Sequence, residues 1–428
     1  MKRYIQTAIY QLRNQPLLSA ITILGTALTI CLIMVILIIY QAKTADYVPE
    51  VNRSRSLYVK WVRYLVDKEK NWASHSRASL WLAKEVFYNL KTPEAVTAYY
   101  LAGDVQVGVT GLADEEVTSL LLTDAAFWKV YQFRFLAGKP YSEAEHQSGI
   151  KSAVVAERVA RRLYGSAEVA IGKTVSINFA DYTICGVVED VNKFCELSYA
   201  EVWAPYNSNG VATGSHESGN GQCTGNYNIV MLAKSSADFD DIRAEVDKGV
   251  NSVNTMLAPH NSELQLMGQP DDFKTQLARI YANQYDNLKG DFYKYLIMIG
   301  IILLVPAINL SGLTNTRMRR RLEELGLRKA FGATSNSLMW QVLNENLVLT
   351  VIGGICGLAL AYAAIWLLGD WLLQTTDSAV ASMNVAMISP VVFFIAFAFC
   401  LLLNMLSAYL PAWRVAHMPI ITSLNQKL

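Results

Sequence analysis

The residues of this sequence that are able to do chemistry do not fall into a catalytic spacing. Gly172-Lys173-Thr174 matches the end of a P-loop, but that motif needs its first glycine where Ala167 stands. Those glycines let backbone N–H groups surround phosphates, so the sequence favours a turn before a strand instead. The five histidines lack paired-ligand spacing, and no G-x-S-x-G turn occurs. We therefore expect a non-enzymatic chain that holds no metal and no cofactor of its own.

Polar and small residues inside apolar stretches are the next candidates. Glu345 lies in an apolar run, so it should face a partner or a helix-bundle interior, or else reach the membrane interface. Asn309 follows Pro306 by three residues, which predicts a kink with a polar contact. Small residues at four-residue spacing let helices approach closely, within the chain or across a dimer. That spacing, which also arises by chance, is found at Gly353, Gly357 and Ala361.

A basic segment is the strongest local pattern in the sequence. Arg317 to Thr334 reads RMRRRLEELGLRKAFGAT and alternates leucines with arginine and glutamate, as a short helix does. Gly332 suits a left-handed C-terminal cap, and Thr334 or Ser335 can cap the next helix. The segment predicts a helix–turn–helix element, and an ordinary basic loop is the alternative.

The elements that position these residues follow from where the charges are missing. The 428 residues are 52% hydrophobic and 17% charged, against about a quarter charged in soluble proteins. The net charge of +1 favours no nucleic acid partner. Four stretches reach the roughly 20 residues that cross a bilayer. They are residues 17–40, 292–314, 336–368 and 387–410.

Lysine and arginine near the ends of these stretches predict their orientation. Basic residues precede the first stretch, separate the second from the third and follow the fourth, whereas residues 369–386 have none. We expect four transmembrane α-helices with an α+β extracytoplasmic domain inserted between helices 1 and 2. The remaining segments are an amphipathic cytoplasmic helix (1–16), the extracytoplasmic domain (41–291), a cytoplasmic coupling helix (315–335), an extracytoplasmic loop (369–386) and a cytoplasmic tail (411–428).

Within residues 41–291, alternating and helical patterns predict both strands and helices. The expected elements are a strand at Leu57–Arg63, a helix at Val154–Tyr164, a hairpin at Thr174–Val188 turning near Ala180 and Asp181, a helix at Asp238–Val253 and a helix at Asp272–Tyr285. A subdomain boundary is expected near residues 207–224, which are rich in Gly, Ser and Asn. Cys185, Cys195 and Cys223 could form one disulfide or remain free thiols.

The segment Glu324 to Thr334, ELGLRKAFGAT, resembles the E-[IL]-G-[IV]-R-K-A-x-G-A-[ST] signature of ABC transporter permeases of the MacB/FtsX/LolC type. Leu327 is the one departure, and it exchanges one aliphatic side chain for another. The continuation Gln341 to Leu347 is similar to that family's Q-x-L-x-E-x-L. The segments Pro411 to Arg414 and Phe127 to Gly138 resemble the end and the periplasmic core of the same family.

The resemblance implies a permease subunit, of the type VII ABC class, that passes ATP-driven motion to its extracytoplasmic domain for export or extraction of a substrate. The implied ATPase-coupling residues are Glu323, Glu324, Gly326, Arg328, Lys329, Gly332 and Ala333. Because the first span begins near residue 17, ATP and Mg²⁺ are expected on a separate cytoplasmic ABC ATPase.

The same resemblance implies a second permease subunit, identical or different, membrane lipid, and a periplasmic adaptor or other extracytoplasmic protein as partners. It places the chain in the bacterial inner membrane as a multi-pass protein with both termini in the cytoplasm. The alternative is an ATPase-switched signalling or scaffold protein that regulates an extracytoplasmic partner such as a cell-wall hydrolase. The sequence leaves the substrate class open.

Overall fold

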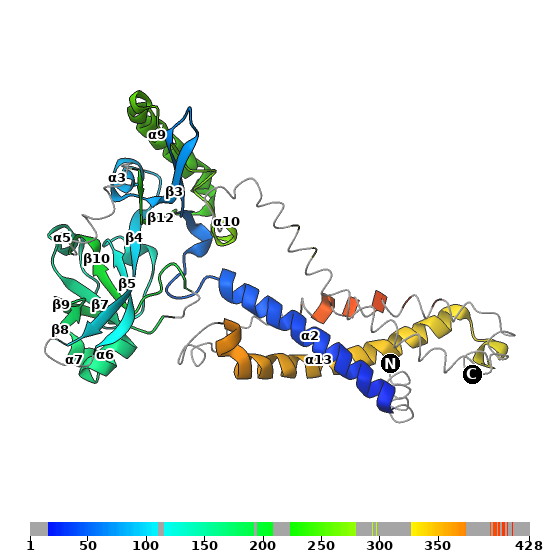
Figure 1. Cartoon of the computed structure of the whole chain (residues 1–428). Coiled ribbons are helices and arrows are strands. Elements are labelled where there is room, and N and C mark those ends of the chain that lie inside the picture. Colours follow the sequence, from blue (N-terminus) through cyan, green and yellow to red (C-terminus); the bar gives the residue numbers. More distant parts are fainter. Residues whose placement is uncertain are drawn as a thin grey trace. The chain divides into compact units, whose positions relative to one another are not determined.

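The chain forms two compact units in a computed structural model (Figure 1). The structure describes residues 16–109, 115–191, 195–208, 223–279 and 327–373, together with scattered helical positions between 293 and 413. Residues 43–291 form one unit, which we call the sheet unit. Residues 1–42 and 292–428 form the other, which we call the helical unit.

The sheet unit is built on a nine-stranded sheet. Its order is β1-β12-β4-β5-β10-β7-β9-β6, with β8 paired to β4 and β9. The β5–β10 and β7–β9 pairs are parallel, and the others are antiparallel. The strands are β1 (Ser56–Val59), β4 (Ala95–Gly108), β5 (Glu116–Thr123), β6 (Phe135–Gly138), β7 (Ser152–Ala156), β8 (Thr174–Ile177), β9 (Ala180–Val188), β10 (Val202–Pro205) and β12 (Asn228–Leu232).

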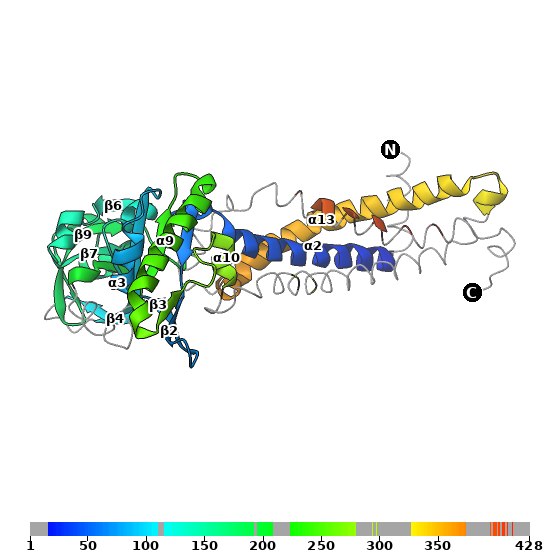
Figure 2. The same ribbon diagram turned by 90° about the horizontal axis from the view of Figure 1, so that it is seen from above.

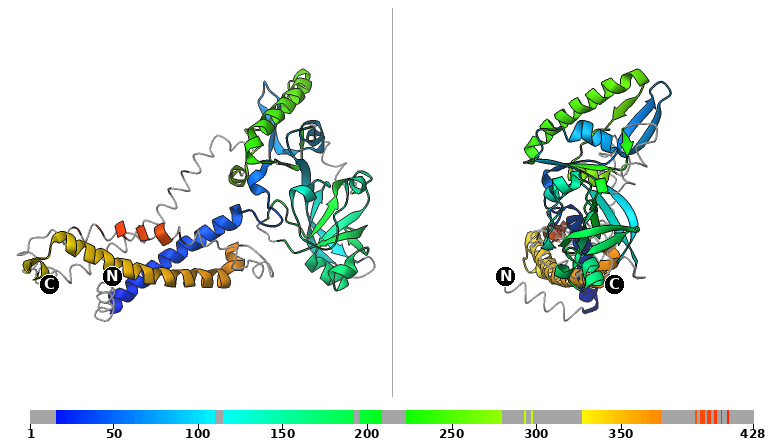
Figure 3. Two further views of the ribbon diagram at one scale, coloured as in Figure 1. Left: turned by 180° about the vertical axis from the view of Figure 1, so that it is seen from behind. Right: turned by 90° about the vertical axis from the view of Figure 1, so that its left-hand side faces the viewer.

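A second sheet of four strands has the order β11-β3-β2-β13. The 19-residue helix α9 (Phe239–Leu257) runs beside it (Figure 3). The α9 side chains Ile242, Val246 and Val253 are buried in the same core as residues of this sheet. The strands are β2 (Val62–Asp67), β3 (Trp72–Ala78), β11 (Thr224–Gly225) and β13 (Glu263–Gln265).

Short helices connect and cover these strands. The helices α6 and α7 lie on the crossover from β7 to the parallel strand β9, as a parallel connection requires (Figure 1). The short helices are η1 (Arg53–Arg55), α3 (Leu80–Leu82), η2 (Ala83–Phe87), α4 (Phe127–Val130), α5 (Glu143–Gln147), α6 (Glu157–Tyr164), α7 (Ala167–Ala170), η3 (Tyr206–Ser208), η4 (Ser236–Asp238), η5 (Ala258–His260) and α10 (Phe273–Ala278).

The strands β7 and β10 of the large sheet are buried on both faces. On β10, Val202 and Ala204 belong to one hydrophobic core, whereas Trp203 belongs to another that is rich in aromatic rings. Strands covered on both faces appear in the sequence as continuous apolar runs, which do not show the two-residue period of a half-buried strand. This is why Val154 to Ala156, predicted as the start of a helix, proves to be the end of strand β7. The helix α6 begins only at Glu157 and ends, as predicted, at Gly165.

The other predicted elements of the sheet unit are present with shifted boundaries. The strand expected at Leu57–Arg63 is divided between β1 and β2. The hairpin turns at Asn178 and Phe179, two residues earlier than predicted, because both adopt positive φ angles, of 47° and 64°. The prediction of one helix from Asp272 to Tyr285 is wrong about its end. Arg279 has an extended backbone and terminates α10. Residues 209–222, most of the expected subdomain boundary, lie outside the described residues.

Among the described residues of the helical unit, two helices are long and apolar enough to cross a membrane (Figure 2). These are α2 (Pro16–Thr44) and α13 (Ser335–Leu373), with candidate spans at Ser19–Leu37 and Ser335–Ala364. Both helices extend beyond the predicted limits of 40 and 368, so residues 369–373, predicted as loop, are helical. A helix longer than the bilayer thickness tilts or projects into water, so these ends are able to carry the charged residues Lys43 and Asp370. Predicted spans 292–314 and 387–410 fall almost entirely outside the described residues, as do residues 1–15.

Candidate functional site

The segment before α13 forms a helix end with a complete set of backbone caps. Residues 327–330 are helical, and Gly332 has a φ angle of +94°. The N–H of Gly332 donates to the carbonyl of Lys329 at 3.1 Å, and that of Ala333 donates to the carbonyl of Arg328 at 3.0 Å. These two bonds are the paired contacts of a Schellman motif, which uses a left-handed glycine to stop a helix. The predicted cap at Gly332 is confirmed.

The following helix is fixed to this turn by side chains. The hydroxyl of Thr334 accepts from the N–H of Ser337 at 3.3 Å, so Thr334 caps the start of α13. Arg328 Nη1 donates to Gln341 Oε1 at 3.0 Å, which joins the first helix to the second turn of α13. The turn therefore connects two helices with little freedom between them.

The small residues predicted for helix packing lie against α2. A Cβ atom at Gly357 would be 2.7 Å from the carbonyl oxygen of Ala27, and one at Gly353 would be 2.8 Å from Cβ of Thr26. Ala361 is 1% exposed and belongs to a cluster with Ile30, Ile33 and Met34 of α2. The two helices thus approach closely along this stripe within one chain, as small residues permit. Packing across a dimer stays a prediction.

The remaining predicted site residues cannot be placed with their surroundings. Glu323, Glu324, Gly326 and Asn309 lie outside the described residues. Glu345 lies on α13, but its side chain is not among the described ones. Of the coupling residues, the structure brings together Arg328, Lys329, Gly332 and Ala333.

Sequence reasoning missed a buried carboxylate in the sheet unit. Asp124 follows β5, is 4% exposed and accepts four hydrogen bonds. The donors are Thr97 Oγ1 and Tyr88 OH, both at 2.6 Å, and the N–H groups of Phe127 at 2.9 Å and Ala98 at 3.1 Å. Burial raises the pKa of Asp124 to about 6, although these donors favour its charged form. Its place shortly after the apolar run Leu120–Leu122 is the signal that could have found it.

Asp124 should therefore make the stability of the sheet unit depend on pH. Its folded pKa of about 6 lies above the unfolded value of about 3.9, so the favourable contribution is complete below pH ~3.9 and is lost as pH rises through 6. We expect this residue to contribute about 1 kcal/mol more at pH 5 than at pH 7. The measurement is hydrogen exchange of the Ala98 and Phe127 amides in the full chain, corrected for intrinsic rates. In Asp124→Asn this part of the pH dependence should vanish. If the protection of the two amides changes with pH as steeply in this variant as in the wild type, Asp124 is not the group responsible.

The Gly172-Lys173-Thr174 segment is a turn before a strand, as predicted. Gly172 has a φ angle of +75°, and its N–H donates to the carbonyl of Ile184 at 2.9 Å. The carbonyl of Lys173 accepts from the N–H of Ile184 at 2.9 Å, so this backbone is part of the sheet.

The described thiols Cys185, Cys195 and Cys223 are free, and burial raises the pKa of Cys185 and Cys223 to about 12. Among the described residues, no group of His, Cys, Asp and Glu side chains could hold a metal ion.

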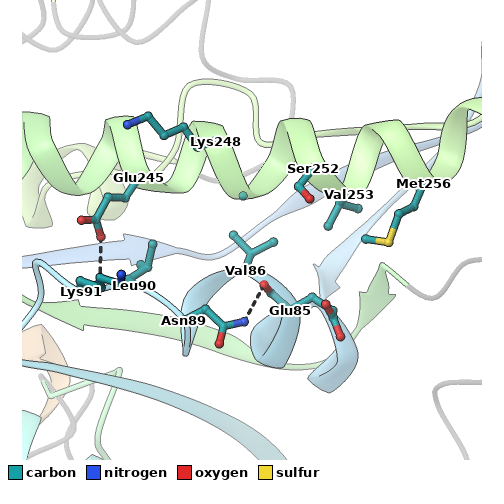
Figure 4. Close-up of a pocket in the computed structure, with 11 residues that line it drawn as sticks. Glu85, Val86, Asn89, Leu90, Lys91, Glu245, Lys248, Ser252, Val253 and Met256 are labelled. Atoms are coloured by element: carbon teal, nitrogen blue, oxygen red, sulfur yellow. Dashed lines mark hydrogen bonds between the residues drawn. The ribbon is translucent and has the colours of Figure 1, made fainter.

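A pocket of about 330 Å³ lies between η2 and α9 (Figure 4). Val86, Val253 and Met256 line it with apolar atoms. Glu245 accepts from the N–H of Lys91 at 2.9 Å and from the hydroxyl of Thr92 at 2.7 Å. This carboxylate therefore holds α9 to the turn that follows η2, which is a packing role.

Two known protein families match this chain, and together the matches include residues of both units. The MacB-like periplasmic core domain matches residues 19–248, more than half of the chain, and the FtsX-like permease C-terminal domain matches residues 296–420. These matches define the class: a membrane permease with an extracytoplasmic domain. The chain belongs to the family of ABC transporter permeases that combines a MacB-like periplasmic core domain with an FtsX-like permease domain.

Curated relatives are distant in sequence. The uncharacterized ABC transporter permease YknZ of Bacillus subtilis is 23% identical over 271 residues, which are 63% of this chain and 60% of YknZ. The macrolide export ATP-binding/permease protein MacB of Pasteurella multocida is 24% identical over 309 residues, which are 71% of this chain and 42% of MacB. The chain thus spans less than two thirds of the length of these relatives. The periplasmic region of MacB from Actinobacillus actinomycetemcomitans aligns with 53% of this chain and 93% of its own, at 15% identity and a TM-score of 0.36.

Proposed function

We propose that this chain is the mechanotransmitting permease subunit of an ABC transporter in the bacterial inner membrane. The segment 315–335 docks a cytoplasmic ABC ATPase, which binds ATP and Mg²⁺ on its own chain. Motion of that ATPase passes through the spans to the extracytoplasmic sheet unit, which exports or extracts a substrate. A second permease subunit completes the dimer.

The observation that carries this proposal is the capped turn from Arg328 to Ala333. Its two backbone bonds and the Arg328–Gln341 contact tie residues 328–333 to the start of α13. A rigid joint is what a lever needs, because a flexible one would absorb a displacement at its end. The family match over residues 296–420 supports the same interpretation.

The first test is the binding of the ATPase to charge-reversed chains. Glu323→Lys, Glu324→Lys, Arg328→Glu and Lys329→Glu together invert the charge of the proposed docking surface. Because misplaced like charges across an interface cost several kcal/mol, we expect the affinity for the partner ATPase to fall by at least about tenfold. Co-purification from membranes and ATP hydrolysis by the complex measure it.

The matched control inverts an exposed pair elsewhere. Glu157 and Arg161 form an ion pair at 2.6 Å on α6 of the sheet unit. Glu157→Lys with Arg161→Glu should leave binding and hydrolysis unchanged. If the coupling variant also binds and stimulates the ATPase normally, residues 323–329 are not the docking surface.

A further inference from the structure

The chain passes between the two units at two places, near residues 42 and 291. The described parts of the sheet unit that come nearest to these crossings in sequence each contain a buried ion pair. After the first crossing, Arg53 Nε is 2.7 Å from Glu50 Oε2, and both side chains are 1% exposed. Before the second, Arg279 contacts Asp271 at 2.5 and 2.9 Å, and these side chains are 0% and 2% exposed. Burying such charges is costly unless further contacts compensate, so their other partners matter.

Arg53 holds the first connection to the body of the sheet unit. Its Nη1 donates to the carbonyl of Ala45 at 2.7 Å, one residue after the end of α2. Its Nη2 donates to Tyr47 OH at 3.3 Å. The paired carboxylate of Glu50 also accepts from the N–H and the hydroxyl of Ser198, at 3.1 and 2.9 Å. Arg53 and Glu50 therefore link the residues after α2 to the segment that leads into β10.

The two connections meet at the same guanidinium. Arg53 Cζ lies 4.7 Å from the ring centre of Phe273, the first residue of α10. The Phe273 ring is 5.7 Å from that of Tyr58 on β1. Tyr58 and Asp271 exchange two backbone hydrogen bonds of 2.9 Å, and Asp271 in turn holds Arg279. A continuous set of contacts thus runs from Ala45 to Arg279.

We propose that Arg53 is a positioning residue that joins both connections into one stem, so that motion of either adjoining segment turns the sheet unit as a body. The planar guanidinium of Arg53 is surrounded by an acid, a carbonyl, a phenol and two aromatic faces. It cannot rotate without losing several of these contacts together. That the stem transmits motion to the sheet unit rests on the proposed mechanotransmission. Its rigidity does not, because rigidity depends on this chain alone.

Hydrogen exchange of the full chain in detergent tests the rigidity directly. Phe273→Leu removes the aromatic face but keeps an apolar side chain on the second connection. If the stem is one body, the amides of Ser54 and Arg55 on the first connection should exchange about threefold to thirtyfold faster. Phe273→Tyr keeps the aromatic face and should restore the slow exchange. Faster exchange confined to α10 would overturn the proposal.

The reciprocal variant changes the other connection. Glu50→Gln with Arg53→Met removes both charges together and avoids leaving one buried charge unpaired. This double variant should make the amides of Gln276 and Arg279 exchange about threefold to thirtyfold faster. Arg55→Met is the matched control, because Arg55 lies on the same turn but pairs with Glu94 at a partly exposed site. If it accelerates exchange at α10 equally, Arg53 has no special role.

A second measurement separates the stem from the proposed function. With the ATPase bound and trapped by vanadate, the wild-type sheet unit should change its exchange pattern, and Phe273→Leu should lose that response while ATP hydrolysis continues. A variant that retains the full response overturns the transmitting role. If the wild-type chain binds no ATPase, the proposed function fails, and the exchange in detergent still decides whether the stem is rigid.

Discussion

Leucine in place of Gly357 is expected to separate α2 from α13 and to lower the thermal stability of the full chain in detergent. Any Cβ at this position would lie 2.7 Å from the Ala27 carbonyl oxygen and 2.9 Å from Cβ of Ile30. Because the first of these atoms belongs to the backbone of α2, a change of side-chain rotamer cannot relieve the clash. Overpacking of this kind costs about 1–3 kcal/mol. Thermal unfolding followed by size-exclusion chromatography measures the loss.

Two further variants identify the cause of this effect. Gly357→Ala adds only the Cβ atom, so it should show a smaller loss in the same direction. Ile355→Leu changes a residue on the same helix that is 65% exposed, and it should leave the unfolding temperature unchanged. Equal stability of Gly357→Leu and the wild type would mean that α2 and α13 do not pack along this stripe. The test also bears on the proposed function, because the proposed transmission of motion requires α2 and α13 to move together.

Valine in place of Gly332 is expected to leave the chain folded and inserted but to weaken its stimulation of ATP hydrolysis. The φ angle of +94° lies where a β-branched residue is strained. A left-handed conformation costs an ordinary residue about 1–2 kcal/mol, which corresponds to roughly a fivefold to thirtyfold shift away from the capped turn. No atom of the other described residues, apart from those of its own turn, lies within 4 Å of a Cβ built at this glycine, so the strain expected from these residues comes from the backbone. ATP turnover of the purified complex measures the loss.

Gly165 supplies a matched control for that variant. It ends α6 with a φ angle of +83°, and a Cβ there also meets nothing within 4 Å in the part of the chain that the structure describes. Gly165→Val should therefore bear a similar backbone strain in the sheet unit without altering stimulation of the ATPase. Gly332→Asn should keep part of the activity, because asparagine tolerates left-handed conformations. Equal stimulation by Gly332→Val and the wild type would remove the turn from the coupling mechanism.

Sequence patterns predicted the features that depend on local chemistry. Gly332 and Thr334 are caps because glycine and threonine meet the backbone needs of adjacent helix ends, and both are found in those roles. The apolar stretch of α2 predicts a spanning helix from length alone. The boundaries of helices and strands were predicted less accurately. The alternation of apolar and polar residues is absent where a strand is buried on both faces, as at Val154 to Ala156.

Contacts between distant residues were decided only by the tertiary structure. The sequence shows Arg53 and Phe273 as an arginine in a polar turn and an aromatic residue far along the chain, and nothing local indicates that they meet. Asp124 likewise becomes a buried acceptor because Tyr88, Thr97 and Phe127 converge on it from other elements. Burial and pairing depend on the packing of the whole unit, so they leave no periodic trace in the sequence.

The sequence by itself thus determined the membrane character of this chain, its permease family and the turn proposed to contact the ATPase, because length, charge and caps act over a few residues. The tertiary structure alone decided that α2 is the partner of the small-residue face of α13, and that Arg53 stands between the two connections of the sheet unit. Those features depend on close packing between segments far apart in the chain, where a single Cβ atom or a single charge changes the outcome.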